Sequence, residues 1–393
     1  MSKQNVLDLR SMVVDGSLFR SPIEADRIEA FIPPSGQSNH ASNMVELPNG
    51  DLLCVWFAAS HEGAGNISIV MSRLAHDASK WTPPVPVSND PSRSEQNPLL
   101  FLTPDEKLWL LYTAQKTREC SPEEWKQKVA SGEAEGDYCM QWTALIRRRV
   151  SEDGGRTWGP VETLFDDSGS FCRQPMLVMS NGDWLFPMYY SLPGQRHGDD
   201  HSIMKISGDR GKTWTEFPVP ESRGRVHASV LELSNGRLVA FFRSRAADRI
   251  YVSRSEDYGR AWTAPERTVL PNNNSSIQAL KLASGNLAII FNNISVNDDD
   301  PDATIWPSMR YPVTVAISED EGHTWPYMRH IDTSDNFCGE KNSHLNRRCA
   351  YPSLMQTKDG AIHIAYSYRD RQCIKYVRVT EDWFKEHGDY VYQ

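Results

Sequence analysis

Residues 151–158 read SEDGGRTW, and closely similar strings return three times further along the chain. These copies are SGDRGKTW at 207–214, SEDYGRAW at 255–262 and SEDEGHTW at 318–325. A string that recurs at such intervals indicates one supersecondary unit per copy, because repeat architectures reuse the same turn. Two weaker relatives, SRLAHDASKW ending at Trp81 and VRVTEDWF around Trp383, extend the predicted count to six units.

A second repeated signal marks a hairpin in each unit. Gly follows Asn, Asp or Ser between two apolar runs in VELPNGDLLCVWF, VMSNGDWLFPM, LELSNGRLVAFF, LKLASGNLAIIF and MQTKDGAIHIAY, and only LFLTPDEKLWLLY lacks the glycine. Such dipeptides supply the positive φ that tight hairpin turns need. We therefore predict an all-β fold, a six-bladed β-propeller of four-stranded antiparallel sheets, forming one domain over residues 1–393. A segment at about 20–35 is expected to close the last blade, and one short helix capped by Ser121 is predicted over 121–133.

Charge and composition exclude several functions. The net charge of -9 argues against a nucleic-acid partner, which would require a basic surface. The chain lacks an apolar run long enough to span a bilayer and lacks a signal-peptide pattern, so we expect no membrane partner and a cytoplasmic location. Seven cysteines without metal-ligand spacing fit a reducing compartment, and no cofactor or metal is expected. The acidic segment 296–302 is interpreted as a solvated loop, and the oligomeric state stays open.

The starts of the first strands carry polar side chains. Stepping back from each hairpin turn, we expect them to face one central funnel: His40, Gln96, Asn97, Arg173, Gln174, His227, Ser276 and Tyr351. A propeller axis used only for packing would have little need for so many polar groups.

The repeated octamer resembles the Asp box of sialidases and their relatives. In that family the box forms the turn between the third and fourth strands, at the rim away from the active site. Its Asp and Ser can bind backbone N–H groups, and its Trp packs between sheets. The resemblance therefore implies a structural role for Asp153, Asp209, Asp257 and Asp320.

Three further segments resemble the catalytic segments of sialidases, in which three arginines clamp the substrate carboxylate and a Tyr paired with a Glu is the nucleophile. FFRSRAADRIYVSRSEDYG and SMRYPVTVAISEDEG are similar to the segments of the second and third clamp arginines and point to Arg243 and Arg310. CAYPSLMQTKDGAIHIAYS is similar to the nucleophile strand and points to Tyr351. The resemblance implies binding of an acidic sugar.

The chain departs from the sialidase pattern at three positions. His40 stands where the first clamp arginine is expected, and His227 stands near the expected partner glutamate. The acid/base aspartate is missing, and FAASHEGAGN offers Glu62 as the acid/base and His61 as a substrate contact. His40 and His227 are candidate catalytic groups, since neutral imidazole is a base and imidazolium a donor.

Other segments add candidates for substrate binding. Arg173, Gln174 and Asn97 are expected to contact the substrate from the first strands, and Tyr190 from the loop that also holds Arg196 and His197. Glu340, in the polar segment 334–351, is a spare acid.

Three functions fit these residues. The first is a retaining exo-glycosidase of sialidase type, with Tyr351 as the nucleophile and Glu62 as the acid. The second is a uronate-specific polysaccharide lyase, in which Tyr or His removes the proton beside a neutralised carboxylate. The third is a non-catalytic, glycan-binding propeller.

Overall fold

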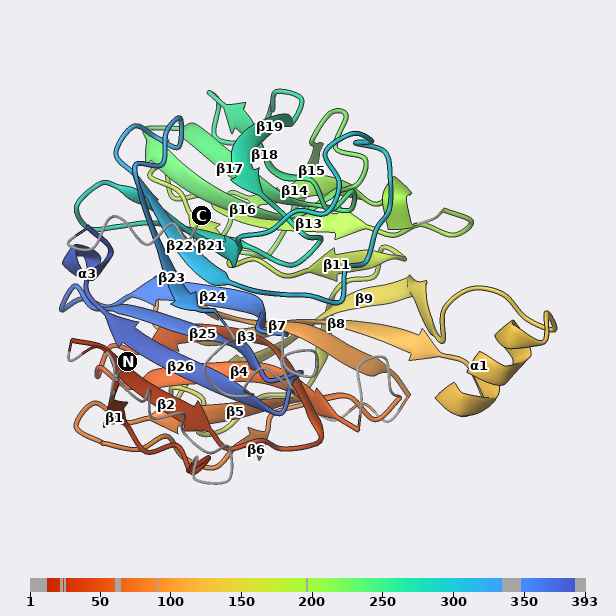
Figure 1. Cartoon of the computed structure of the whole chain (residues 1–393), viewed down its shortest axis with the longest axis horizontal. Coiled ribbons are helices and arrows are strands. Elements are labelled where there is room, and N and C mark those ends of the chain that lie inside the picture. The colour runs from red at the N-terminus through yellow and green to blue at the C-terminus, as the bar shows by residue number, and fades with distance from the viewer. Residues whose placement is uncertain are drawn as a thin grey trace, which may run out of the picture.

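The computed structural model describes residues 13–21, 24, 26–60, 65–88, 90, 92–195, 197–333 and 348–385. These residues are mainly β-structure with little helix, and their strands form antiparallel hairpins (Figure 1). The strands fall into six consecutive antiparallel units. Five hydrogen-bonded sheets hold them, because a single parallel pair, His201 with Arg225, joins the third and fourth units into one nine-stranded sheet.

The six units have the following bounds. The first is β3 (Ser38–Glu46), β4 (Leu52–Ala59), β5 (Ser68–Leu74) and β6 (Val85–Pro86), and the second is β7 (Ser94–Leu102), β8 (Leu108–Thr117), β9 (Cys139–Ser151) and β10 (Glu162–Phe165). The third is β11 (Ser170–Cys172), β12 (Leu177–Val178), β13 (Trp184–Tyr190), β14 (His201–Ser207) and β15 (Thr215–Pro218), and the fourth is β16 (Arg225–Ser234), β17 (Arg237–Ser244), β18 (Arg249–Ser255) and β19 (Glu266–Pro271). The fifth is β20 (Gln278–Lys281), β21 (Leu287–Asn292), β22 (Val313–Ser318) and β23 (Tyr327–Asp332). The last is β24 (Ala350–Gln356), β25 (Ile362–Tyr368) and β26 (Cys373–Val379), extended by β2 (Ile28–Ile32) and β1 (Phe19–Arg20).

The first and last units lie against each other. β2 pairs antiparallel with β26, so an N-terminal strand belongs to the last sheet. β24 of that sheet also contacts β3 of the first unit, and the two units lie side by side in Figure 1, in blue and in red to orange. The first strands of other neighbouring units also contact each other, as β3 contacts β7 and β16 contacts β20.

Three short helices interrupt the strands within the described residues. The predicted helix is confirmed as α1 (Pro122–Ala130), where Ser121 Oγ accepts from Glu124 N and the Glu124 carboxylate accepts from Ser121 N. The others are a 3-10 turn, η2 (His197–Asp199), and α3 (Glu381–Lys385). The interpretation of Trp383 as a sixth copy of the octamer is wrong, because this residue is buried within α3 and not in a turn between strands. No helix among the described residues is long and apolar enough to cross a membrane.

The four full octamers form the same turn between the third and fourth strands of their units. Ser151 Oγ accepts from Gly155 N at 2.7 Å, and Asp153 Oδ1 accepts from the N–H groups of Arg156 and Thr157 at 3.0 and 2.8 Å. The turn around Asp209 repeats these bonds, and a hydrogen bond from the Thr213 backbone is the main reason that the pKa of Asp209 falls to about 2. The carboxylates are occupied by their own turns, so they are structural.

The first strands of four units share a β-bulge. Their register shifts after His40, Gln96, Val226 and Ala350. At each shift one residue takes a left-handed backbone conformation, and these residues, with φ of 61°, 53°, 55° and 52°, are Ala41, Asn97, His227 and Tyr351. Bulges re-aim side chains, and positive φ is uncommon for a residue as bulky as Tyr. The bulge therefore re-aims one side chain at the same point of these four first strands, and three of the four side chains are polar.

A buried ion cluster links β2 and β26 of the last unit to β23 of the fifth unit. Lys375 on β26 lies 3.1 Å from Asp332 on β23 and 3.4 Å from Glu29 on β2, and the side chains of all three are less than a tenth exposed. We expect Lys375→Met to lower the free energy of unfolding by about 3–5 kcal/mol, because two buried carboxylates lose the cation that they share, although Arg27 still pairs with Glu29. Arg378→Met, on the same strand, should cost less than about 1 kcal/mol, because the Arg378–Asp359 pair is exposed. Urea unfolding measures both, and equal losses would contradict the role of the cluster.

Candidate active site

Tyr351 lies at the centre of the candidate site. It is the bulge residue of β24, and its side chain is buried, with 8% of the residue exposed. Arg243 Nη1 donates to the Tyr351 hydroxyl at 2.6 Å. Because positive φ at a tyrosine costs conformational energy and persists where the surroundings impose it, this backbone makes Tyr351 a candidate functional position.

Three arginines from different units surround the Tyr351 ring. The guanidinium carbons of Arg173, Arg243 and Arg310 lie 5.5, 5.4 and 5.5 Å from the ring centroid. Arg173 follows β11, Arg243 lies on β17, and Arg310 precedes β22. Arg310 Nη1 also donates to Ser275 Oγ at 3.2 Å. The three arginines are far apart in the sequence. Because they converge on one ring in the structure, their guanidinium groups can share one ligand.

Arg243 is a buried cation that is not fully satisfied. It is 1% exposed; Nε donates to Asn274 Oδ1 at 2.8 Å, and Nη2 is buried with no hydrogen-bond partner among the described residues. Burial lowers the pKa of Arg243, and likewise of Arg173, to about 10. A buried guanidinium nitrogen that lacks an acceptor is costly unless an anion binds it. The site is therefore preorganised for a negatively charged group.

Two buried histidines flank the tyrosine. The His40 ring lies 4.2 Å from the Tyr351 ring and its Nδ1 lies 2.7 Å from Ser367 Oγ. The His227 ring lies 5.8 Å from Tyr351, edge-on, and its Nδ1 lies 3.1 Å from Ser276 Oγ. Burial, followed by the nearby arginines, holds the pKa of both histidines well below the usual 6.5. Both imidazoles are therefore neutral at physiological pH.

These histidines should make the fold sensitive to acid. Because the folded-state pKa of His227 lies below its unfolded value of 6.5, the unfolded chain takes up a proton where the folded chain does not. The free energy of unfolding is fully retained above about pH 6.5 and falls as the pH drops below it. Urea unfolding on the two sides of this pH should show that His227→Gln reduces the difference in stability. The exposed His76→Gln should leave the difference unchanged; a parallel loss there would argue against the burial effect.

The other predicted contacts divide into two groups. Gln174 Nε2 donates to Ile277 O and to Ser276 Oγ, so Gln174, Ser276 and His227 form one connected group. Asn97 is buried at its own bulge, and Cys172 Sγ lies 3.7 Å from its carbonyl oxygen. Tyr190 does not join the site, because its hydroxyl donates to Glu216 at 2.7 Å and its ring belongs to a hydrophobic core cluster.

Tyr189, the residue before Tyr190, lies beside the candidate site. Side chains alternate along β13, so Tyr189 faces the opposite way from Tyr190. The Tyr189 ring lies 5.3 Å from the His227 ring, and the Arg245 guanidinium carbon lies 5.8 Å from the Tyr189 ring. The sequence could not separate these two adjacent tyrosines, because the end of the strand was not known.

Sequence reasoning also missed Arg245, Asp200 and Trp306. Arg245, two residues after Arg243, donates from Nε and Nη2 to the fully buried Asp200. Trp306 lies beside both arginines, 5.3 Å from the Arg243 guanidinium and 5.0 Å from that of Arg245, and is 49% exposed. An Arg-x-Arg pair at a strand end was the available signal for Arg245. Nothing in the sequence around Trp306 marked its position.

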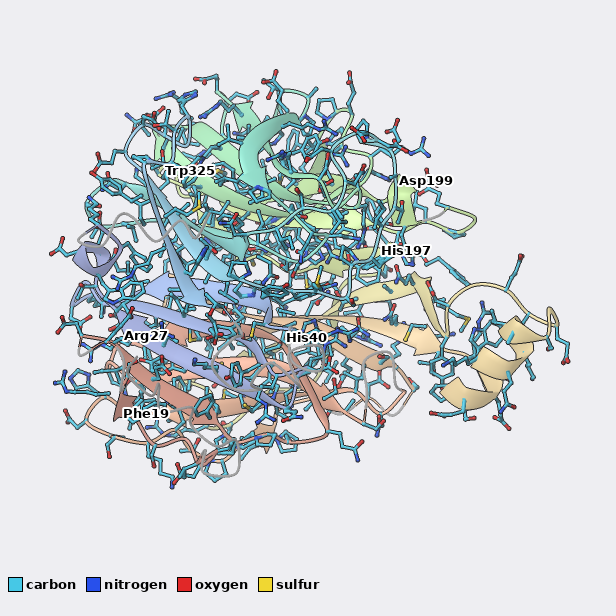
Figure 2. The ribbon with its side chains drawn as sticks, viewed as in Figure 1. Phe19, Arg27, His40, His197, Asp199 and Trp325 are labelled. Atoms are coloured by element: carbon cyan, nitrogen blue, oxygen red, sulfur yellow. The ribbon has the colours of Figure 1, made fainter. Side chains whose placement is uncertain are left out.

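Some of the predicted site residues lie outside the described residues. His61, Glu62, Arg196 and Glu340 are among them. His197 is described, and its Nε2 lies 2.7 Å from the Asp137 carboxylate. Figure 2 shows His40 between the two halves of the molecule and His197 on the side of α1, whereas Trp325 of a repeated turn lies at the opposite side. Among the described residues, no group of His, Cys, Asp and Glu could hold a metal ion.

Comparisons with known proteins find similarity to sialidases. A sialidase of Bacteroides fragilis (strain YCH46) is 29% identical over 200 residues, which are 47% of this chain and 34% of that protein. The match thus spans about a third of that relative. Two solved structures have similar folds: Hadza microbial sialidase Hz136, with 18% identity and a TM-score of 0.67 over 88% of this chain and 66% of that one, and a protein of unknown function from Dyadobacter fermentans DSM 18053, with 17% identity and a TM-score of 0.69 over 90% and 98%.

The repeats themselves identify the family. The model of the BNR repeat-like domain matches residues 50–364, which include all four full octamers and the hairpins between them. The chain is therefore a sialidase-like member of the BNR repeat-like domain family.

Proposed function

We propose that the protein is an exo-glycosidase of sialidase type that removes a terminal acidic sugar from a glycan with retention of configuration. One observation carries this proposal: Arg243, Arg173 and Arg310 converge on the ring of Tyr351, and Arg243 Nη2 is buried without an acceptor among the described residues. A sugar carboxylate would supply the missing acceptor in the bidentate geometry that guanidinium groups favour.

In the proposed mechanism Arg243 and Arg310 hold the carboxylate while Tyr351 attacks the anomeric carbon. The bond from Tyr351 Oη to that carbon forms as the bond to the leaving oxygen breaks, and the leaving oxygen takes a proton from an acid, for which we propose Glu62. His40 or His227, both neutral, can receive the phenol proton. Water then gives a proton to the Glu62 carboxylate and attacks the same carbon as the bond from that carbon to Tyr351 Oη breaks. Tyr351 takes its proton back from the histidine, and the two displacements give net retention.

The fold that we propose for this chemistry is a six-bladed propeller, formed by residues 1–393 as one domain. The six antiparallel units, the pairing of β2 with β26 and the contact of β24 with β3 support this closure. Polar residues at the starts of the first strands would then meet at the axis. Arg173, Gln174, Asn97 and His61 are proposed to contact the substrate there.

A uronate-specific lyase is the second candidate. Two neutral imidazoles beside Tyr351 favour it, because a lyase needs a base for the proton next to the carboxylate and has no need of a nucleophile. The arginines would then neutralise the uronate carboxylate. The difference between the two candidates lies in the reaction and not in the class of sugar.

One experiment tests both candidates. The purified protein is incubated in parallel with fluorogenic α-ketoacid glycosides and with uronate-capped oligosaccharides. Fluorophore release supports the hydrolase, and ultraviolet absorbance of an unsaturated uronate supports the lyase. Turnover of neutral glycosides alone would contradict both, and binding of an acidic glycan without turnover would leave the protein a glycan-binding propeller.

A further inference from the structure

A basic groove lies beside the helical insertion of the second unit. It is a cavity of about 630 Å³ between α1 and the strands that lead to and from it, and its lining includes Lys116, Arg118, Trp125 and Lys128. In Figure 1, α1 projects from the ends of β8 and β9, away from the sheets. No residue of α1 is buried, so the insertion does not complete the hydrophobic core.

The groove carries an excess of positive charge. Lys116, Arg118 and Lys128 line it with a single carboxylate, that of Glu119. None of these three cations forms a direct ion pair in the part of the chain that the structure describes, although the Glu124 carboxylate attracts Lys128 and the Asp137 carboxylate attracts Arg118 at longer range. In a protein with a net charge of -9, three cations around one cavity that is lined by a single carboxylate point to an anionic ligand.

Aromatic rings hold the central cation in place. The Arg118 guanidinium carbon lies 4.3 Å from the Trp125 ring and 5.3 Å from the Trp142 ring. Trp125 Nε1 donates to Gly136 O at 3.0 Å, which fixes the indole against the returning chain. A guanidinium stacked in this way keeps its N–H edge available for a carboxylate, and indole faces also suit the apolar faces of sugar rings.

A chain of contacts connects the groove to the candidate active site. Arg118 Nε donates to the main-chain oxygen of Asp137 at 3.4 Å, and the Asp137 carboxylate lies 2.7 Å from His197 Nε2. The His197 ring lies 5.5 Å from that of Trp306, which in turn lies over Arg243. The groove and the arginine cluster therefore belong to one side of the molecule.

We infer that this groove binds a second carboxylate-bearing sugar of the same acidic oligosaccharide whose terminal sugar lies at Tyr351. The inference rests on the proposed function. It assigns the substrate class: an oligosaccharide with more than one acidic sugar, as opposed to a neutral glycan with one acidic end. Lys116 and Lys128 bind the carboxylate with Arg118, and Trp125 packs against the ring.

Binding measured without turnover tests the inference. In full-length Tyr351→Phe protein, calorimetry gives the Kd of a disialylated oligosaccharide and of a hyaluronan tetrasaccharide, which both carry more than one carboxylate, and of a neutral maltotetraose. We expect tight binding of at least one acidic probe, and Lys116→Ala/Lys128→Ala should weaken it by about ten-fold. Added salt should raise the Kd of the acidic probe by a larger factor in the parent than in the double variant.

The matched control is Lys126→Ala. Lys126 is an exposed residue of the same helix that does not line the groove, so this variant should bind like the parent. The inference is overturned if the double variant binds like the parent, if Lys126→Ala loses as much affinity, or if maltotetraose binds as tightly as the acidic probes. If the wild-type protein hydrolyses acidic glycosides in that case, the proposed function is supported and only the role of the groove is rejected. If the groove binds an acidic probe but no glycoside or uronate is turned over, the proposed function is rejected and the role of the groove is supported.

Discussion

Tyr351→Phe should lower kcat for an acidic-sugar glycoside by at least about a thousand-fold. The change deletes one oxygen and keeps the ring that packs against His40 and lies among the arginines. Without the hydroxyl there is no atom to form the bond to the anomeric carbon and no acceptor for Arg243 Nη1. The substrate carboxylate still meets the arginines, so KM should change much less than kcat. Steady-state kinetics on a fluorogenic acidic glycoside separates the two constants.

Tyr258→Phe is the matched control for this loss. Tyr258 lies in a repeated octamer, beside Gly236 of a hairpin turn, and its hydroxyl contacts only the exposed Ser180 among the described residues. Turnover should be unchanged there, because the octamer turns are structural. Retention of near-normal turnover by Tyr351→Phe would exclude Tyr351 as the nucleophile. A loss of turnover in Tyr258→Phe would contradict a purely structural role for the octamer turns.

Arg243→Lys should lower kcat/KM for the same glycoside by about a hundred-fold. Lysine keeps the positive charge but cannot donate at once to Asn274, to Tyr351 and to a carboxylate, as the guanidinium can. The loss should be mainly in KM, since the clamp is proposed to bind the carboxylate in the ground state. The measurement is a comparison of kcat and KM for the two proteins.

Arg237→Lys provides the control on the same strand. Arg237 is partly exposed at the hairpin end of β17, where it pairs with Glu321, so its replacement should leave kcat/KM unchanged. An effect of Arg243→Lys no larger than that of Arg237→Lys would show that Arg243 does not hold the substrate.

The repeated octamers carried most of the fold prediction. Their Ser, Asp and Gly are required by one turn, so their positions located the third and fourth strands, and the Gly-containing hairpins located the first and second. The prediction failed at Trp383, where the sequence resembles the repeat but forms α3. A helix of five residues is too short to show helical periodicity, so the sequence offered no contrary signal.

The candidate site could be predicted only in part. Arg243, Arg310 and Tyr351 were found because their segments resemble sialidase segments at the same place relative to a repeat, and the structure brings these side chains together. Trp306 could not be found, because it lies in an irregular segment between β21 and β22 whose path depends on tertiary contacts. The sequence could not separate Tyr190 from Tyr189, because a shift of one residue reverses the face of a strand.

The most direct test of the proposed function compares two substrates that differ in one group. An acidic-sugar glycoside and its carboxamide analogue share size and leaving group, and only the first offers a carboxylate to Arg243 and Arg310. We predict that kcat/KM for the acid exceeds that for the amide by at least about a hundred-fold, because buried charge-assisted hydrogen bonds are lost in the amide. Equal values for the two substrates would contradict a carboxylate clamp around Tyr351.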